Sequence, residues 1–423
     1  MVSIADMGVS LLESDMATFD LVIKNARLRQ KEGLWHLGVI GSRISAISPT
    51  PLDGAIELDA SENLVTESFV DGHMHLCKVY TYRSFGDAAN AEYATGTMGG
   101  AMTGIDIASK IKENYHESWI YENAKKAALE AIRHGVLHIQ AFVDTDTKAR
   151  LEGIKGVMRV RDELKKILRI EIVAFPQDGL LRDPGAESFV NEAMALGADR
   201  VGGIPWIENT DANAEEHIRR MLELAKKHDA RVAMLTDDAG DANLRTTAML
   251  ATGALAHGLE GRITSCHARA MALYPEPTFL RLAALAKQAG MGFITDPHTG
   301  PLHLRALDLF DQGHAVGIGH DDIEDPYYPW GRYNFLEIAY LASHILEAIT
   351  RSRMEDLFDM ITTRAATAIG ITDHQLAVGN EANLLIHGQP DVHEVLNHHE
   401  APKIVISHGK VVAKTNTESE LFI

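Results

Sequence analysis

The chain has 423 residues, of which 46% are hydrophobic and 23% are charged, and its acidic residues outnumber the basic ones by 59 to 40, for a formal charge of −19. This length and composition are ordinary for a folded protein with one large domain and a small one, or with two to three modest domains. The negative charge argues against nucleic acid or an anionic membrane as a partner.

Compartment signals are few. The two cysteines, Cys77 and Cys266, cannot make a disulfide framework and indicate a reducing environment. The first 20 residues carry acids and no basic run, so we expect no secretory signal. No run of about 18 uncharged apolar residues occurs, so we expect no membrane-spanning helix. Together these features predict a soluble, cytoplasmic protein.

The two ends of the chain have a β character. Residues 19–73 form short, alternating, β-branched runs separated by turn residues, and residues 379–388, 402–410 and 411–415 repeat the pattern. The ends are therefore predicted to pair into one small β-domain.

The central part of the chain alternates between helical and buried-strand patterns. Helical segments of about 12–15 residues alternate with strands of about 5–6, which is typical of a parallel sheet. The strands are predicted within residues 69–75, 136–144, 169–177, 198–206, 230–238, 261–268, 291–297 and 314–322. Eight strands are the number that closes a (β/α)₈ barrel. An open doubly wound sheet is the alternative, but no GxGxxG turn follows any strand.

Two segments interrupt this alternation. Residues 77–118 include the Gly-, Met- and Ala-rich stretch DAANAEYATGTMGGAMTG, which is either a lid over the barrel or a mobile surface loop. The stretch DVHEVLNHHE at 391–400 is rich in histidine and is predicted to be a loop among the outer strands.

Polar residues gather where the predicted strands end, which is where barrel enzymes place their chemistry. Loops begin at these points, which would account for any single polar residue. It does not account for a histidine or an acid at five of eight strand ends, and imidazoles that converge with carboxylates suit a zinc or iron ion. The residues in question are His73, His75, Gln177, Asp178, Thr236, Asp237, Asp238, His267, Asp296, His298, His320, Asp321 and Asp322.

Several of these stretches resemble motifs of the amidohydrolase superfamily, in the branch that contains cytosine deaminase and N-isopropylammelide hydrolase. The similar stretches are FVDGHMHLCK, IEIVAFPQDGLL, ALGADRVGGIP, ITSCHARAM and GIGHDDIEDPYYPWG. The resemblance covers nearly the whole chain. It implies a (β/α)₈ TIM barrel at residues 67–374, flanked by a small β-sandwich built from residues 1–66 and 375–423.

The resemblance also implies a divalent metal ion, zinc or iron first, with manganese or cobalt as further options. The implied ligands are His73, His75 and Asp321. The family's fifth-strand histidine ligand falls at Leu235, which cannot bind a metal, and its glutamate falls at Asp238. Three possibilities follow: the three ligands suffice, a neighbour replaces the fourth, or the site is metal-free or weakly metallated. The candidate replacements are Cys77, Asp237, Asp238 and His298.

Roles follow from the same resemblance. Asp321 is expected to accept a proton from water, His267 to stabilise the developing charge, and Asp238 to deliver a proton. Gln177 offers a donor and an acceptor, which suits an amide edge of a heterocycle. Independently of the resemblance, the aromatic residues Tyr327, Tyr328 and Trp330 follow Asp321 and either stack on a planar substrate or pack under the turn DPYYPWG.

Basic residues near the predicted barrel mouth bear on the substrate. Lys78, Arg83 and Arg269 either attract an anionic substrate or pair with local aspartates. His298 is the remaining candidate for a substrate contact.

The sequence therefore predicts a metal-dependent hydrolase that acts on a C–N bond, a deaminase or amidohydrolase, with a small heterocyclic substrate that is anionic if the basic residues at the mouth are free to bind it. The alternative is a divergent barrel without a bound metal that acts as a lyase, an isomerase or a small-molecule binder. A homo-oligomer is expected from the resemblance only.

Overall fold

The computed structural model describes residues 19–422, so most of the segment predicted to lack a secretory signal lies outside the described residues. Eight parallel strands follow one another in chain order around a single sheet, and an isolated bridge between Met74 and Asp321 joins the last strand to the first. The prediction of a (β/α)₈ barrel is confirmed. The strands are β6 (Phe69–Met74), β7 (Val136–Asp144), β8 (Arg169–Phe175), β9 (Arg200–Gly203), β10 (Arg231–Thr236), β11 (Ile263–His267), β12 (Gly292–Thr295) and β13 (Val316–Ile318).

Amphipathic helices cover the outside of the barrel, as the 3.6-residue spacing of their apolar residues requires. In helix α4, for example, Ile120, Ala124, Ala127 and Ala131 are buried. The covering helices are α4 (Glu117–Arg133), α5 (Glu152–Leu164), α6 (Ala186–Leu196), α7 (Asp211–Lys227), α8 (Thr246–His257), α9 (Glu276–Gln288), α10 (Ala306–Asp311), α11 (Phe335–Ile345) and α12 (Arg351–Met360). Helix α13 (Thr363–Ala368) instead contributes Ala365, Ala366 and Ala368 to the apolar cluster inside the barrel. No helix within residues 19–422 is long and apolar enough to cross a membrane.

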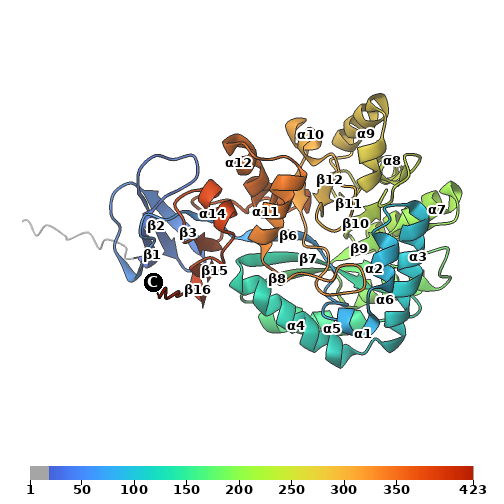
Figure 1. Ribbon diagram of the computed structural model, residues 1–423, viewed down its shortest axis with the longest axis horizontal. Helices are drawn as coiled ribbons and strands as arrows, with labels where there is room; N and C mark the ends of the chain where they lie inside the picture. The colour runs from blue at the N-terminus through green and yellow to red at the C-terminus, as the bar shows by residue number, and fades with distance from the viewer. Residues whose placement is uncertain (1–18, 423) are drawn as a thin grey trace, which may run out of the picture.

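Two four-stranded sheets lie beside the barrel and bring the two ends of the chain together (Figure 1). Their strand orders are β3-β2-β1-β4 and β16-β15-β14-β5, so a strand from each end pairs where β5 meets β14. The two sheets share one apolar core. The strands are β1 (Phe19–Ala26), β2 (Trp35–Ile40), β3 (Arg43–Ser48), β4 (Gly54–Asp59), β5 (Val65–Glu67), β14 (Leu384–Ile386), β15 (Ile404–Ser407) and β16 (Lys410–Lys414). The domain boundaries at 66/67 and 374/375 stay predictions.

Both irregular segments are helical. Residues 82–114 form α1 (Tyr82–Phe85), α2 (Ala88–Tyr93), α3 (Met98–Ala108) and a 3₁₀ turn, η1 (Ser109–Asn114). The prediction of a loop at residues 391–400 is wrong, because Val392–His398 form helix α14. Asp391 caps that helix by accepting a hydrogen bond from the Glu394 backbone N–H at 3.0 Å, and α14 packs on α11 and α12.

A buried histidine makes the core sensitive to acid. His387 is 1% exposed, its Nε2 lies 2.9 Å from the Thr66 hydroxyl, and burial lowers its pKa from an ordinary 6.5 to about 3. Above pH 6.5 both the folded and the unfolded chain hold it neutral. Below pH 6.5 His387 becomes protonated in the unfolded chain but stays neutral in the folded chain. The free energy of unfolding therefore falls as the pH is lowered, until about pH 3.

We therefore expect the free energy of unfolding of the wild-type protein to fall by about 2 kcal/mol more than that of His387→Gln between pH 6.5 and pH 5. Urea unfolding at both pH values measures the difference. His398→Gln, which changes an exposed histidine of α14, should behave like the wild-type protein. Equal pH dependence in His387→Gln and the wild type would contradict the prediction.

Candidate metal centre and active site

The first and last barrel strands place His73, His75 and Asp321 side by side. The Asp321 backbone N–H donates to the His73 carbonyl and the His75 N–H donates to the Asp321 carbonyl, both at 2.8 Å. Asp321 and His267 each adopt a left-handed backbone, with φ of 66° and 67°. Such a conformation is uncommon for residues other than glycine and clusters at functional sites.

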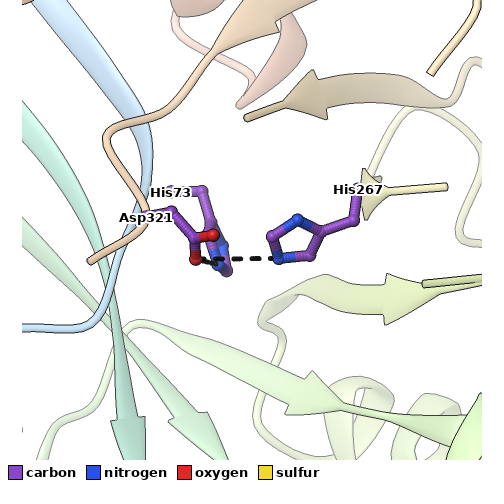
Figure 2. Close-up of side chains that lie close together, drawn as sticks. All are labelled: His73, His267 and Asp321. Carbon is purple, nitrogen blue, oxygen red and sulfur yellow. Dashed lines mark ion pairs between the residues drawn. The ribbon is translucent and has the colours of Figure 1, made fainter. Parts of the chain in front are cut away.

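Three imidazoles surround one carboxylate oxygen. Oδ1 of Asp321 lies 3.2 Å from Nε2 of His73, 3.8 Å from Nε2 of His75 and 3.8 Å from Nε2 of His267. Figure 2 shows His267 pointing across the site toward His73 and Asp321. Two sets have their ligand atoms within 4.8 Å of one another: His73 with His267 and Asp321, and His75 with Asp321 and Asp322. His267, predicted only as a catalytic residue, therefore also lies within reach of a shared ion.

Burial sets the charge state of this cluster. It lowers the pKa of His73, His75 and His267, which favours the neutral form of each ring, so that His73 and His75 can each offer a lone pair. Burial alone would raise the pKa of Asp321, but His267, His73 and His75 hold it well below its usual range. Both ring nitrogens of His73 and Nδ1 of His75 are sealed from water without a hydrogen-bond partner among the described residues. Neutral imidazoles around an ionised carboxylate fit a divalent cation.

Leu235 leaves a gap in this ring of polar groups. It lies on β10 beside Cys266 of β11, is 3% exposed, and belongs to the apolar cluster that fills the barrel interior. It also lines the cavity described below. The fifth strand therefore presents an alkyl side chain toward the site.

The candidate replacement ligands have other partners. Cys77 Sγ lies 3.7 Å from the Tyr115 hydroxyl, and burial raises the pKa of its thiol to about 12. Asp237 caps helix α8 by accepting from the Thr246 N–H at 2.6 Å. His298 Nε2 lies 3.2 Å from the His320 carbonyl, and its ring lines a separate groove. None of these three joins either compact set within residues 19–422.

Hydrogen bonds from Arg269, continued by Thr299, link residues at the ends of four barrel strands. Its Nε donates to Asp238 Oδ1 at 2.7 Å and its Nη2 donates to the Thr299 hydroxyl at 2.7 Å and to His267 Nδ1 at 3.1 Å. Thr299 in turn donates to Asp321 Oδ2 at 2.7 Å. The predicted cation at the mouth thus has its donors committed to the chain's own groups.

The neighbours of Asp238 shift the pKa of its carboxyl group in opposite directions. Burial raises its pKa to about 7, although the neighbouring Arg269 guanidinium lowers it, and the Asp321 charge raises it further. The Tyr93 hydroxyl lies 3.4 Å from both of its carboxylate oxygens. Asp238 can therefore exchange a proton near neutral pH.

These groups open onto a small cavity. Its lining combines polar side chains with apolar and aromatic ones, which is typical of a site for a small organic ligand. The lining residues are His75, Tyr93, Ile105, Gln177, Ile204, Trp206, Leu235, Asp238, His267, Asp321, Asp322 and Tyr327.

The helical segment after the first barrel strand reaches over the cavity, because Tyr93 ends α2 and Ile105 lies on α3. Lys112 of η1 anchors the segment at Asp146 and Asp178, with Nζ 2.5 Å from an oxygen of each. The segment therefore forms part of the cavity wall, and its action as a lid stays a prediction.

Lys78 and Gln177 are joined in the wall of the cavity. Lys78 Nζ donates to Gln177 Oε1 at 2.8 Å, lies 3.7 Å from Asp144 Oδ1 and is 5.1 Å from the centre of the Tyr327 ring. Burial alone would lower the pKa of Lys78, but Asp144 and other acids raise it above its usual value. Arg83 is exposed on α1.

Several cavity residues escaped the sequence analysis. Ile204 and Trp206 follow β9 within three residues, so the strand-end rule covers both positions, but neither carries a group typical of catalysis. Tyr93 and Ile105 carry no such signal. These two reach the cavity only because the helical segment folds back over the barrel.

Comparison with known proteins gives a consistent result. A family model described as the amidohydrolase family matches residues 57–413. The chain is 28% identical over 403 residues to N-isopropylammelide isopropyl amidohydrolase of Pseudomonas sp. (strain ADP), covering 94% of this chain and 98% of that one. It is 23% identical over 376 residues to pterin deaminase of Rhizobium rhizogenes, covering 84% and 82%. The crystal structure of 5-methylcytosine deaminase from Klebsiella pneumoniae liganded with 5-fluorocytosine superimposes with a TM-score of 0.86 at 28% identity, covering 95% of this chain and 99% of that one.

Proposed function

The chain belongs to the amidohydrolase family, and from that premise we propose that it is a metal-dependent hydrolase of a C–N bond in a small heterocyclic compound. One observation carries the proposal: the Nε2 atoms of His73, His75 and His267 all lie within 4 Å of Asp321 Oδ1 at the mouth of the barrel. The names of its relatives, an ammelide amidohydrolase, a pterin deaminase and a 5-methylcytosine deaminase, support a heterocycle as substrate.

The metal would be held by His73, His75 and Asp321, with His267 within reach. When bound, a divalent cation lowers the pKa of a coordinated water toward about 7. Imidazole nitrogen and carboxylate oxygen are ligands that zinc, iron, manganese and cobalt all accept. Zinc or iron is our proposal for the resident ion.

The chain's own residues supply the remaining chemistry. Asp321, held ionised, accepts a proton from the attacking water. His267 stabilises the negative charge that develops on the substrate. Asp238, whose pKa is raised to about 7, returns a proton to the leaving nitrogen. Tyr327 and Gln177 orient the ring, and the lid residues Tyr93 and Ile105 restrict water.

Metal analysis combined with an ammonia and amine release assay tests the proposal. Protein purified without chelator should carry close to one equivalent of a transition metal by ICP-MS, and it should release ammonia or an amine from a panel of amino-substituted pyrimidines, triazines and pterins. A protein that stays metal-free after reconstitution and releases neither product would contradict it. That result would favour the lyase, isomerase or binding alternative.

Restoring a ligand at position 235 should strengthen metal binding. We expect Leu235→His to raise the affinity for Zn²⁺ by about tenfold or more, because a fourth protein ligand completes a tetrahedral set. Competition with a chromophoric chelator measures the change. Leu280→His, which adds a histidine at an exposed position of α9, should leave the affinity unchanged. An unchanged affinity in Leu235→His would show that residue 235 lies outside the ligand sphere.

A further inference from the structure

The orientation of the Gln177 amide is fixed by its neighbour. Lys78 Nζ lies 2.8 Å from Oε1, and an ammonium group can only donate hydrogen bonds. The atom that faces it must therefore be the amide oxygen, since the opposite orientation would place two donors against each other. Gln177 thus turns its oxygen toward Lys78 and keeps its NH₂ group for another partner.

Lys78 has little freedom to release that oxygen. Its side chain is 2% exposed, and its ammonium group lies between Asp144 Oδ1 at 3.7 Å and the face of Tyr327 at 5.1 Å. Swinging away would separate a buried cation from its carboxylate, which is costly. Lys78 therefore holds the Gln177 amide in one orientation.

The other half of the amide faces the cavity wall. Gln177 lines the cavity, and none of the hydrogen bonds among the described residues involves its Nε2. Trp206, from the next strand end, lines the same cavity, and its buried indole N–H has no acceptor within residues 19–422. Neighbouring strand ends, those of β8 and β9, thus contribute two unmatched donors.

The acceptors lie elsewhere in the cavity. Asp238 follows β10, and Asp321 and Asp322 follow β13, so the carboxylates come from different strand ends than Gln177 and Trp206. The two unmatched donors and the carboxylates of the cavity therefore come from different strand ends. An edge of a ring that faces Gln177 Nε2 and Trp206 Nε1 would meet hydrogen-bond donors.

We propose that the site selects heterocycles by an acceptor-only edge, in which a carbonyl oxygen lies next to an unprotonated ring nitrogen, and that Lys78 and Gln177 determine this specificity. The inference rests on the proposed function and names its substrate class. It corrects the sequence-based view that Gln177 presents both a donor and an acceptor to an amide edge. A ring whose nitrogen carries a proton at that edge would oppose N–H to N–H and bind at least about tenfold more weakly.

Binding of two neutral probes without a leaving amine tests this selectivity. In 1-methyl-2-pyrimidinone the ring nitrogen beside the carbonyl is unprotonated, whereas in 1-methyluracil it carries hydrogen. We expect titration calorimetry to give at least about tenfold tighter binding of 1-methyl-2-pyrimidinone to the wild-type protein. Equal affinities, a preference for 1-methyluracil, or no binding of either probe would overturn the inference.

Two variants test whether the hydrogen bond from Lys78 to Gln177 causes the probe preference, rather than a general change in charge or shape. Gln177→Glu keeps a partner for Lys78 but replaces the donor with an acceptor, so the preference should reverse toward 1-methyluracil. Lys78→Met frees the amide to rotate, so the two affinities should come within about threefold of each other. Circular dichroism checks that both variants fold. Gln312→Glu makes the same chemical change at an exposed position and should keep the wild-type ratio.

The two proposals fail in distinguishable ways. Neither probe can be hydrolysed at an exocyclic amine, so the ratio of affinities does not depend on catalysis. Release of ammonia without a probe preference, or a full preference retained in Lys78→Met, would overturn the acceptor-edge inference alone. A clear preference in a protein that binds no metal and hydrolyses nothing would overturn the hydrolase proposal alone.

Discussion

Replacement of Asp321 by asparagine is expected to lower kcat/KM by about 10³-fold or more on any heterocycle that the release assay identifies. The carboxylate is proposed both to hold the metal and to accept a proton, and a neutral amide does the first poorly and the second not at all. Three imidazole Nε2 atoms lie within 4 Å of its Oδ1, so the change removes the charge on which the whole cluster converges.

Metal content gives a second readout for the same variant. After dialysis, Asp321→Asn should retain much less metal than the wild-type protein by ICP-MS. Asp53→Asn, which makes the same change at an exposed position before β4, should retain both metal and activity. Full activity in Asp321→Asn would contradict the proposed role. Full metal content with lost activity would separate the proton acceptor from the metal ligand.

Replacement of Arg269 by methionine should have the largest effect on stability, about 3–5 kcal/mol. The guanidinium is 4% exposed, and the Asp238 carboxylate that it contacts at 2.7 Å is equally buried. Its loss leaves a buried carboxylate without a cation, and it also leaves the Thr299 hydroxyl and the Leu302 carbonyl without a donor. Urea unfolding measures the loss.

A second substitution distinguishes an unpaired charge from a simple packing defect. Asp238→Asn in the Arg269→Met background removes the isolated charge and should recover a large part of the lost stability. Arg332→Met disrupts an exposed ion pair with Glu337, whose atoms are 2.9 Å apart, and should cost less than about 1 kcal/mol. A similarly small cost in Arg269→Met would show that the buried network does not stabilise the fold.

The fold could be predicted because periodicity is a local property of the chain. Each barrel strand is a short buried run between helical patterns, and each is visible without knowledge of its neighbours. The pairing of β5 with β14 was also foreseeable, since both ends of the chain carry alternating apolar residues that need a partner. The helix at Val392–His398 was missed because the histidine-rich composition suggested a loop, and Asp391 was not considered as a helix N-cap.

Residue type and strand-end position determined which groups enter the candidate site. His73, His75, His267 and Asp321 end strands, and the topology of a parallel barrel brings all strand ends to one face. The position of Leu235 on the fifth strand likewise followed from the sequence. None of this required knowledge of side-chain directions.

Only the tertiary structure decided what those groups can offer a substrate. Lys78 and Gln177 are 99 residues apart, and nothing in either stretch indicates that one locks the other as a donor. The sequence left open whether Arg269 attracts an anionic substrate or pairs with an aspartate, and the structure places its donors on Asp238, His267 and Thr299. The sequence by itself determined the barrel and the residues at its mouth, because patterning and topology act along the chain. The tertiary structure decided the hydrogen-bond polarity and charge of the site, because these depend on contacts between residues distant in sequence.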